Sequence, residues 1–225
     1  MPDRPGGDPA YSGPTDGRPA RGGPADANPA MSDLPFGPGG IPDWLEPILR
    51  YCSRCGGRLE FGPVEGEERS RFSCSVCGHV TYVNPRLVVT TLPVTERGEV
   101  MLIRRGIEPG RGLWAQPGGF LEVDETVREA AVRETLEETG LLVEPGEIVG
   151  LYSRVPAAVV VLAFEARIVG GAPRTTTESL ETRPFAPDAI PWPEIAFETS
   201  RDALRDWVAR VRPDLPLPQP PPTGR

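Results

Sequence analysis

Features that direct a protein to a membrane or to a nucleic acid are scarce in this 225-residue sequence. It contains no apolar run long enough to cross a bilayer, and its first residues, MPDRPGGDPA, lack the apolar stretch that secretion requires. Positive charge is in the minority: the formal net charge is -8, which argues against a general binder of phosphate backbones. We therefore expect a cytoplasmic protein whose ligand is a small molecule.

Cysteine and histidine are rare too, with four cysteines and one histidine, His79. The cysteines form two C-x-x-C pairs, Cys52 with Cys55 and Cys74 with Cys77. In a reducing compartment this spacing favours a closed tetrahedral site over disulfide bonds, so we predict a structural Zn2+ ion in a small ribbon. An iron site with the same ligands, or cysteines that are free or bonded in pairs, remain alternatives. His79 follows the last cysteine and is a fifth candidate ligand, or simply an exposed residue of the turn.

Apolar residues are sparse at both ends of the chain. Prolines and glycines are concentrated there, and such segments bury too little apolar surface to offset the entropy lost on ordering. We predict disordered tails at 1–40 and 213–225, with the zinc ribbon at 41–86 and a larger domain at 87–212. Prolines recur every five residues in the first tail, which is either a solvated linker or a motif for a partner.

The part between the tails contains patterns of both helices and strands. Periodicity predicts helices at 41–49, 123–139 and 200–211, and strands at 87–94, 100–105, 158–168 and 183–185. The first two strands flank a turn at 96–98 and therefore read as a hairpin. Because the strands are interspersed with helices rather than alternating strictly with them, we expect an α+β fold with a mixed sheet between helices.

The predicted helix at 123–139 carries an unusual cluster of acids near its end. Glu134, Glu137 and Glu138 have the i, i+3, i+4 spacing that places their carboxylates on one face, where like charges repel. A hard divalent cation such as Mg2+ removes that cost, because it binds carboxylates and substrate phosphates together. Arg133 is placed to orient these carboxylates, and Gly118 would bring backbone close to a metal ion or phosphate. A solvated glutamate-rich face is the alternative.

Signals at both ends support this helix. Thr126 and Glu129 have the spacing of a capping box, and Gly140 is placed to end the helix in a left-handed turn. The complete pattern resembles the Nudix box, whose fixed positions here are Gly119, Glu125, Arg133, Glu134, Glu137, Glu138, Gly140 and Leu141. Thr135 departs from that pattern, since a bulky aliphatic residue often stands there.

The resemblance implies a Nudix hydrolase with an α/β/α sandwich around a mixed sheet, and it extends from about Tyr51 to about Trp207. A ribbon joined through TYVNPRLVV to such a domain is similar to the branch that contains ADP-ribose/FAD pyrophosphatases and NADH pyrophosphatases. By resemblance, Mg2+ or Mn2+ would be held by Glu134, Glu137, Glu138 and a backbone carbonyl near Gly118. Arg133 would orient these glutamates, and Glu125 would support the box.

Two roles stay open within this resemblance. The general base is either a glutamate of the box or Glu178, although Glu178 and Glu181 also read as a solvated pair. Candidate contacts for phosphates or a base are Arg104, Arg105, Trp114, Tyr152 and Phe197, for which core or rim positions are the alternative.

The resemblance predicts cleavage of a nucleoside diphosphate derivative such as ADP-ribose or FAD. An NADH pyrophosphatase or RNA NAD-decapping enzyme is the second hypothesis, although the segment 150–156 keeps only a serine and a proline of the motif typical of those enzymes. A non-catalytic adaptor that senses a ligand or grips nucleic acid is the third. Nucleic acid is otherwise expected only as a capped-RNA substrate, and many Nudix enzymes of this size form homodimers.

Overall fold

A computed structural model of the chain describes residues 36–37, 41–42 and 45–218. Most of the predicted disordered tails therefore lies outside the described residues. Residues 213–218 belong to the second predicted tail but are described, and Leu215 and Leu217 pack against the main core because both side chains are apolar. No helix in the described part of the chain has the length and apolar character needed to span a membrane.

The ribbon is a small antiparallel sheet with the order β3-β4-β5. Its strands are β3 (Leu59–Gly62), β4 (Arg71–Cys74) and β5 (Val80–Thr81). The helix expected at 41–49 is wrong: β2 (Ile41–Pro42) pairs with β1 (Phe36–Gly37), and only the short 3-10 helix η3 (Glu46–Ile48) follows. Pro47 explains this, because it lies in the interior of the expected helix and lacks the backbone N–H that a continuous helix needs there.

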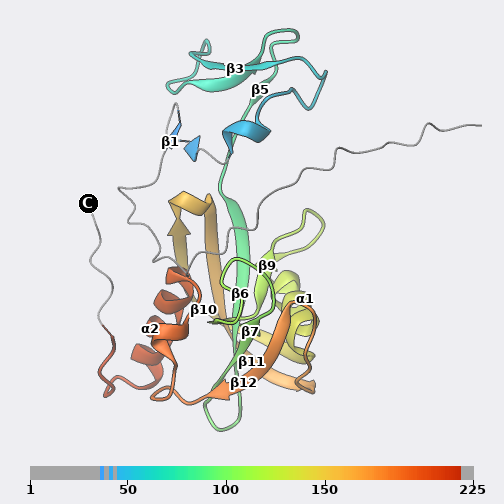
Figure 1. The fold of residues 1–225 in the computed structure, drawn as a ribbon. Coiled ribbons are helices and arrows are strands. Elements are labelled where there is room, and N and C mark those ends of the chain that lie inside the picture. Colours follow the sequence, from blue (N-terminus) through green and yellow to red (C-terminus); the bar gives the residue numbers. More distant parts are fainter. Residues whose placement is uncertain (1–35, 38–40, 43–44, 219–225) are drawn as a thin grey trace, which may run out of the picture.

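A seven-stranded mixed sheet forms the centre of the larger domain (Figure 1). Its main path has the order β10-β11-β6-β7-β12, with β9 paired to β6 and β8 paired to β7; only β11 and β6 are parallel. The strands are β6 (Arg86–Val94), β7 (Val100–Arg105), β8 (Trp114–Ala115), β9 (Gly118–Phe120), β10 (Leu141–Arg154), β11 (Val159–Gly171) and β12 (Ser179–Phe185). The hairpin predicted from the sequence is confirmed as β6 and β7.

Helices α1 (Val127–Thr139) and α2 (Glu198–Val211) cover opposite faces of this sheet. The side chains of β6 show this: Val89 packs with Ala130 and Ala131 of α1, whereas Leu92 packs with Leu204 of α2. Odd and even residues of a strand point to opposite faces, so the layers are α/β/α, as expected. Two short 3-10 helices, η4 (Val155–Ala157) and η5 (Trp192–Glu194), complete the domain.

Both long helices differ from their predicted bounds at the start. Helix α1 begins at Val127 rather than at Val123, because Thr126 has an extended backbone and caps the first turn. The C-terminal helix begins at Glu198, two residues earlier than expected. The four residues removed from the first helix form a loop that carries Glu125, which matters for the site.

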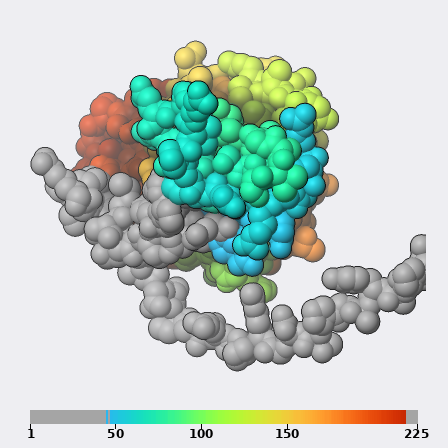
Figure 2. All heavy atoms as spheres, turned by 90° about the horizontal axis from the view of Figure 1, so that it is seen from above, coloured from blue at the N-terminus to red at the C-terminus, as the bar shows by residue number. Residues whose placement is uncertain are grey.

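The ribbon lies at the end of the sheet where β6 begins, and the chain passes from β5 directly into β6 (Figure 1). Seen from that end, the ribbon lies in front of the larger domain (Figure 2).

Candidate active site and thiolate cluster

The helix α1 is positioned by the two caps that its sequence predicts. The Thr126 side chain accepts a hydrogen bond from the Glu129 backbone, and the Glu129 carboxylate accepts one from the Thr126 backbone at 2.8 Å. At the other end Gly140 has φ 75°, a left-handed conformation that glycine adopts without strain. The capping box and the glycine terminus are therefore confirmed.

Thr135, the departure from the usual box, is fully buried and has a partner in the sheet. Its hydroxyl lies 2.6 Å from the hydroxyl of Thr91 in β6 and donates to the carbonyl of Ala131 at 2.7 Å. A hydroxyl has one proton, so Thr135 accepts from Thr91 while it donates to Ala131. The polar residue is thus satisfied by a threonine 44 positions away, a partner that local sequence patterns do not indicate.

The three clustered glutamates differ in their surroundings. Glu137 is largely exposed, whereas the Glu134 and Glu138 carboxylates face the glycine loop that contains β9. Gly118 donates its backbone N–H to Glu138 at 2.8 Å. Gly118 is required for space, because a Cβ added there would come 2.3 Å from the Val89 carbonyl oxygen, whereas a Cβ added at Gly119 would come 2.4 Å from Glu134 Oε1 and would displace that carboxylate. The structure therefore brings the predicted glutamates and glycines together.

Arg133 links the glutamates to the loop before α1. It holds Glu125 through two hydrogen bonds, from Nε at 2.8 Å and from Nη2 at 2.5 Å. Its Nη1 donates to Glu134 at 2.7 Å and to Glu137 at 3.3 Å, and its Nη2 also donates to the Phe120 carbonyl. These hydrogen bonds from Arg133 hold the pKa of Glu125 at about 2. Arg133 and Glu125 thus have the geometry of residues that orient metal-binding carboxylates.

Burial disfavours the charged forms of Glu134 and Glu138, the two inner glutamates that face the glycine loop, when no cation is bound. It raises the pKa of Glu138 to about 7; the hydrogen bond from Gly118 opposes that rise and the nearby Glu134 adds to it. Burial also raises the pKa of Glu134, against the influence of Arg133. Two buried carboxylates whose charged forms are disfavoured in this way gain a large stabilisation from a divalent cation.

Arg105 and Glu178 reach the same site from other segments. Arg105 pairs with Ser179, the neighbour of Glu178, in the β7–β12 ladder. Burial lowers the pKa of Arg105, and the negative charges of Glu138, Glu178 and Glu108 oppose that shift. The Arg105 guanidinium lies 4.9 Å from the ring centre of Phe197 and donates to the Pro109 carbonyl at 2.8 Å. One cation and one further carboxylate thus lie beside the box.

The other candidate contacts lie away from this cluster. Arg104 donates to the Gly112 carbonyl at 2.9 Å and approaches Glu181 at 4.0 Å. Trp114 is 3% exposed and belongs to the core under α2, so its ring face is not available to a ligand. Tyr152 hydrogen-bonds to Asp206 of α2 at 2.8 Å.

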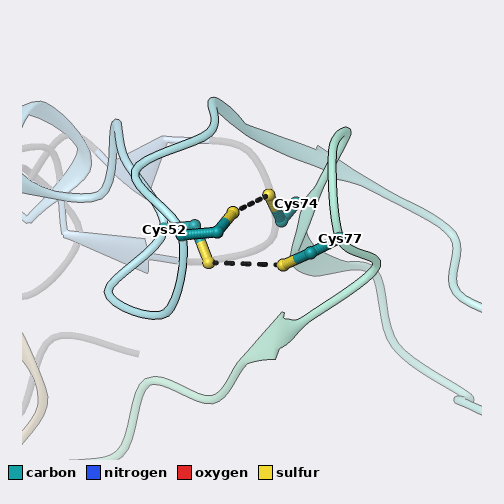
Figure 3. Close-up of side chains that lie close together, drawn as sticks. Cys52, Cys74 and Cys77 are labelled. Carbon is teal, nitrogen blue, oxygen red and sulfur yellow. Dashed lines mark hydrogen bonds between the residues drawn. The ribbon is translucent and has the colours of Figure 1, made fainter.

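The four cysteines form the second cluster (Figure 3). Their sulfur atoms all lie within 4.8 Å of one another, with Cys52 and Cys77 at 3.8 Å and Cys55 and Cys74 at 3.5 Å. Four sulfurs at about 2.3 Å from one tetrahedral Zn2+ ion lie roughly 3.8 Å apart, so the cluster fits such an ion.

Backbone N–H groups also point at these thiolates. Arg54 donates to Cys52, Gly57 to Cys55 and Val76 to Cys74, each at 3.4 Å. A Cβ added to Gly57 would approach the Cys74 sulfur to 2.9 Å. His79 lies outside the cluster of ligand atoms found among the described residues, so it is not a fifth ligand.

Comparison with known proteins agrees with both clusters. Residues 84–208 match the NUDIX domain family, and residues 50–83 match the family described as Nudix N-terminal, a zinc ribbon. A crystal structure of a NUDIX hydrolase from Nitrosomonas europaea has 35% sequence identity and a TM-score of 0.69, and the match covers 76% of this chain and 96% of that one.

Two relatives have named activities. An ADP-ribose pyrophosphatase of Methanocaldococcus jannaschii is 35% identical over 131 residues, which are 56% of this chain and 75% of the relative. The NAD-capped RNA hydrolase NudC of Pseudomonas aeruginosa is 30% identical over 143 residues, 63% of this chain. The chain spans about half the length of that NudC relative, 49%. Since the matched NUDIX domain makes up more than half of the chain and includes the acidic helix with its glycine loop, the chain belongs to the NUDIX family of hydrolases.

Proposed function

We propose that this protein is a divalent-cation-dependent pyrophosphatase that cleaves a nucleoside diphosphate derivative, ADP-ribose or a FAD-like dinucleotide, to AMP and a phosphorylated product. One observation carries the proposal: Glu134, Glu137 and Glu138 share one face of α1, and the two inner carboxylates face a loop where glycine is sterically required. Carboxylates arranged in this way are ligands for Mg2+ or Mn2+.

The residues present fit such a cation. The two inner carboxylates are held by Arg133 and by the Gly118 N–H, and Glu137 stands exposed beside them. A backbone carbonyl near Gly118 would add a ligand. When bound, divalent cations would neutralise the diphosphate oxygens and acidify the attacking water.

The remaining groups have roles that follow from their charge. Arg105 lies beside Glu138 and is suited to bind a phosphate oxygen of the substrate, with Phe197 holding the guanidinium plane. Removal of the proton from water falls to a carboxylate, either one of the box or Glu178. Glu178 is exposed, its neighbour Ser179 pairs with Arg105, and its negative charge adds to the rise in the pKa of Glu138, which supports it as the candidate outside the box.

The ribbon would hold Zn2+ through Cys52, Cys55, Cys74 and Cys77. A four-thiolate site has no open position, so its role is structural. The cysteines are unpaired, which suits a reducing compartment such as the cytoplasm.

ADP-ribose is the first substrate to test, because the ADP-ribose pyrophosphatase relative is matched over three quarters of its length, 75%. NAD-capped RNA or NADH is the second candidate, since the NudC relative is also 30% identical. These substrates share the diphosphate on which the site acts and differ in what lies beyond it.

The test is a panel of ADP-ribose, FAD, NADH and NAD-capped RNA with Mg2+ or Mn2+, followed by chromatography of the monophosphate products. The Glu137→Gln variant removes one ligand that is exposed and has no part in the core, so folding should be retained. Loss of one metal ligand should lower the rate by roughly 10²- to 10³-fold, since a metal supplies several kcal/mol of transition-state stabilisation. The matched control is Glu147→Gln, an exposed glutamate on β10.

Cleavage that disappears in Glu137→Gln and persists in Glu147→Gln supports the proposal, and the order of rates identifies the substrate. If no member of the panel is cleaved with either cation, the proposed substrate class is wrong. Faster cleavage of NADH or NAD-capped RNA than of ADP-ribose and FAD would favour the second candidate.

A further inference from the structure

A groove of about 640 Å³ lies between the ribbon and the end of the large sheet. One wall comes from β3, β4 and the residues before β4, and the other from the tip of the β10–β11 hairpin, residues 153–160. The linker that joins ribbon and sheet, residues 83–85, lies between the two walls. The volume of the groove is within the range of sites that hold small molecules.

The charge of this groove is opposite to that of the whole chain. Arg69, Arg71 and Arg154 line it, and none of the described residues that line it is acidic, although the chain carries a net charge of -8. Two of these arginines come from the ribbon and one from the hairpin tip. An anion in the groove would therefore meet positive charge from both walls.

Each arginine has donors left for a ligand. Arg71 donates through Nε to Glu67 at 3.2 Å, and Arg154 pairs through Nη1 with Glu198; neither glutamate lines the groove. A guanidinium has five N–H donors, so both side chains are held in place with donors to spare. Arg69 is exposed and has no ion pair within the described part of the chain.

The rest of the groove is mostly apolar. Phe61 and Phe72 contribute from the ribbon, and Val155 and Val160 from the hairpin tip. A pocket with arginines and apolar side chains of this kind suits a ligand that combines a phosphate with a flat ring.

The groove is separate from the acidic site. Val159 in its wall pairs with Arg86 at the start of β6, whereas Gly118 of the acidic site pairs with Thr90. These positions differ by four residues along β6, which corresponds to roughly 13 Å. A ligand held by the groove arginines would therefore leave the carboxylate cluster free for substrate.

We propose that this groove is a second site, which binds a free nucleoside 5′-monophosphate. The phosphate pairs with Arg69, Arg71 and Arg154, and the base lies against the valines of the hairpin tip. The groove is large enough for one nucleotide, and its arginines match a doubly charged phosphate. AMP is the probe because it is a product of the proposed function; only this choice of nucleotide rests on that function.

Calorimetric titration of AMP into the full chain tests the site. The buffer contains neither divalent cations nor chelator, so that the carboxylate cluster offers AMP no bridging metal ion and the ribbon keeps its zinc. Arg69→Gln should weaken AMP binding about tenfold, the effect of losing one charge-assisted hydrogen bond. Val155→Glu, which places a negative charge at the opposite wall, should weaken it at least as much. Arg58→Gln removes the same charge from an exposed position of the ribbon outside the groove and should leave binding unchanged.

Absence of saturable AMP binding in the millimolar range, or equal weakening by Arg69→Gln and Arg58→Gln, would overturn the inference. A rise in the KM for ADP-ribose that parallels the loss of AMP binding in Arg69→Gln would also overturn it, because the groove would then hold part of the substrate. If AMP binds with the expected pattern but no substrate is cleaved, the second site stands and the proposed function fails. If cleavage proceeds without AMP binding, only the second site fails.

Discussion

The buried hydroxyl pair of Thr91 and Thr135 should respond asymmetrically to substitution. Thr135→Val removes the acceptor on which the Thr91 hydroxyl depends, and leaves that hydroxyl buried without a partner. Thr91→Val leaves Thr135 bonded to the Ala131 carbonyl, so nothing is orphaned. An unsatisfied buried donor costs about 1–3 kcal/mol, whereas a satisfied network that loses one neutral hydrogen bond loses about 0.5–1.5 kcal/mol.

We therefore expect Thr135→Val to be the more destabilising single variant, and the double variant to be close to Thr91→Val. Valine and threonine are both branched at Cβ, so helix and strand preferences change little. Urea unfolding gives the three free energies, and each kcal/mol should lower Tm by roughly 2–4 °C in a domain of this size.

An equal loss of stability in Thr91→Val and Thr135→Val, or simple addition of the two effects in the double variant, would contradict this prediction. Additivity would mean that the two hydroxyls do not interact, despite their 2.6 Å separation.

Three further predictions address the glycine loop, the helix cap and the ribbon. Gly119→Ala should abolish cleavage while leaving the unfolding transition in place, because the new Cβ displaces only the Glu134 carboxylate; wild-type kcat would contradict this. Hydrogen bonds from Thr126 lower the pKa of Glu129 below its usual 4.5, so the stability it contributes is present above that pH and is lost as the pH falls. In the Glu129→Gln variant, acid unfolding followed by circular dichroism should show a smaller loss of stability as the pH falls. A pH dependence identical to that of the wild type would contradict this prediction. Cys74→Ser should release zinc, measured with a chromogenic chelator, while α1 and the large sheet stay folded; retained zinc would contradict a four-thiolate site.

The sequence predicts the acidic helix well because its signals are local. The capping box of Thr126 and Glu129, the glycine terminus at Gly140 and the spacing of the glutamates depend only on residues within a few turns. The helix begins four residues later than periodicity predicts, directly after the Thr126 cap. The preceding loop is held by the contact of Arg133 with Glu125, which periodicity does not show.

Other features depend on segments that are distant in sequence. Thr91, which satisfies the unusual Thr135, lies on a strand that packs against the helix only after the sheet has formed. Leu215 and Leu217 pack against the core although their segment is rich in proline. The groove arginines gave no signal in the sequence, since they come from the ribbon and from a hairpin 83 residues further on, at Arg154.

The sequence by itself determined which carboxylates share a helix face, at i, i+3 and i+4, and which cysteines form each C-x-x-C pair, because local geometry brings these side chains together. The two cysteine pairs meet only through the pairing of β3 with β4. Only the tertiary structure decided that Arg105 joins the carboxylates while its neighbour Arg104 turns to Gly112 and Glu181. It also decided that a positively charged groove remains between ribbon and sheet. Successive residues of a strand point to opposite faces, so sheet register and packing, rather than separation along the chain, determine which side chains meet.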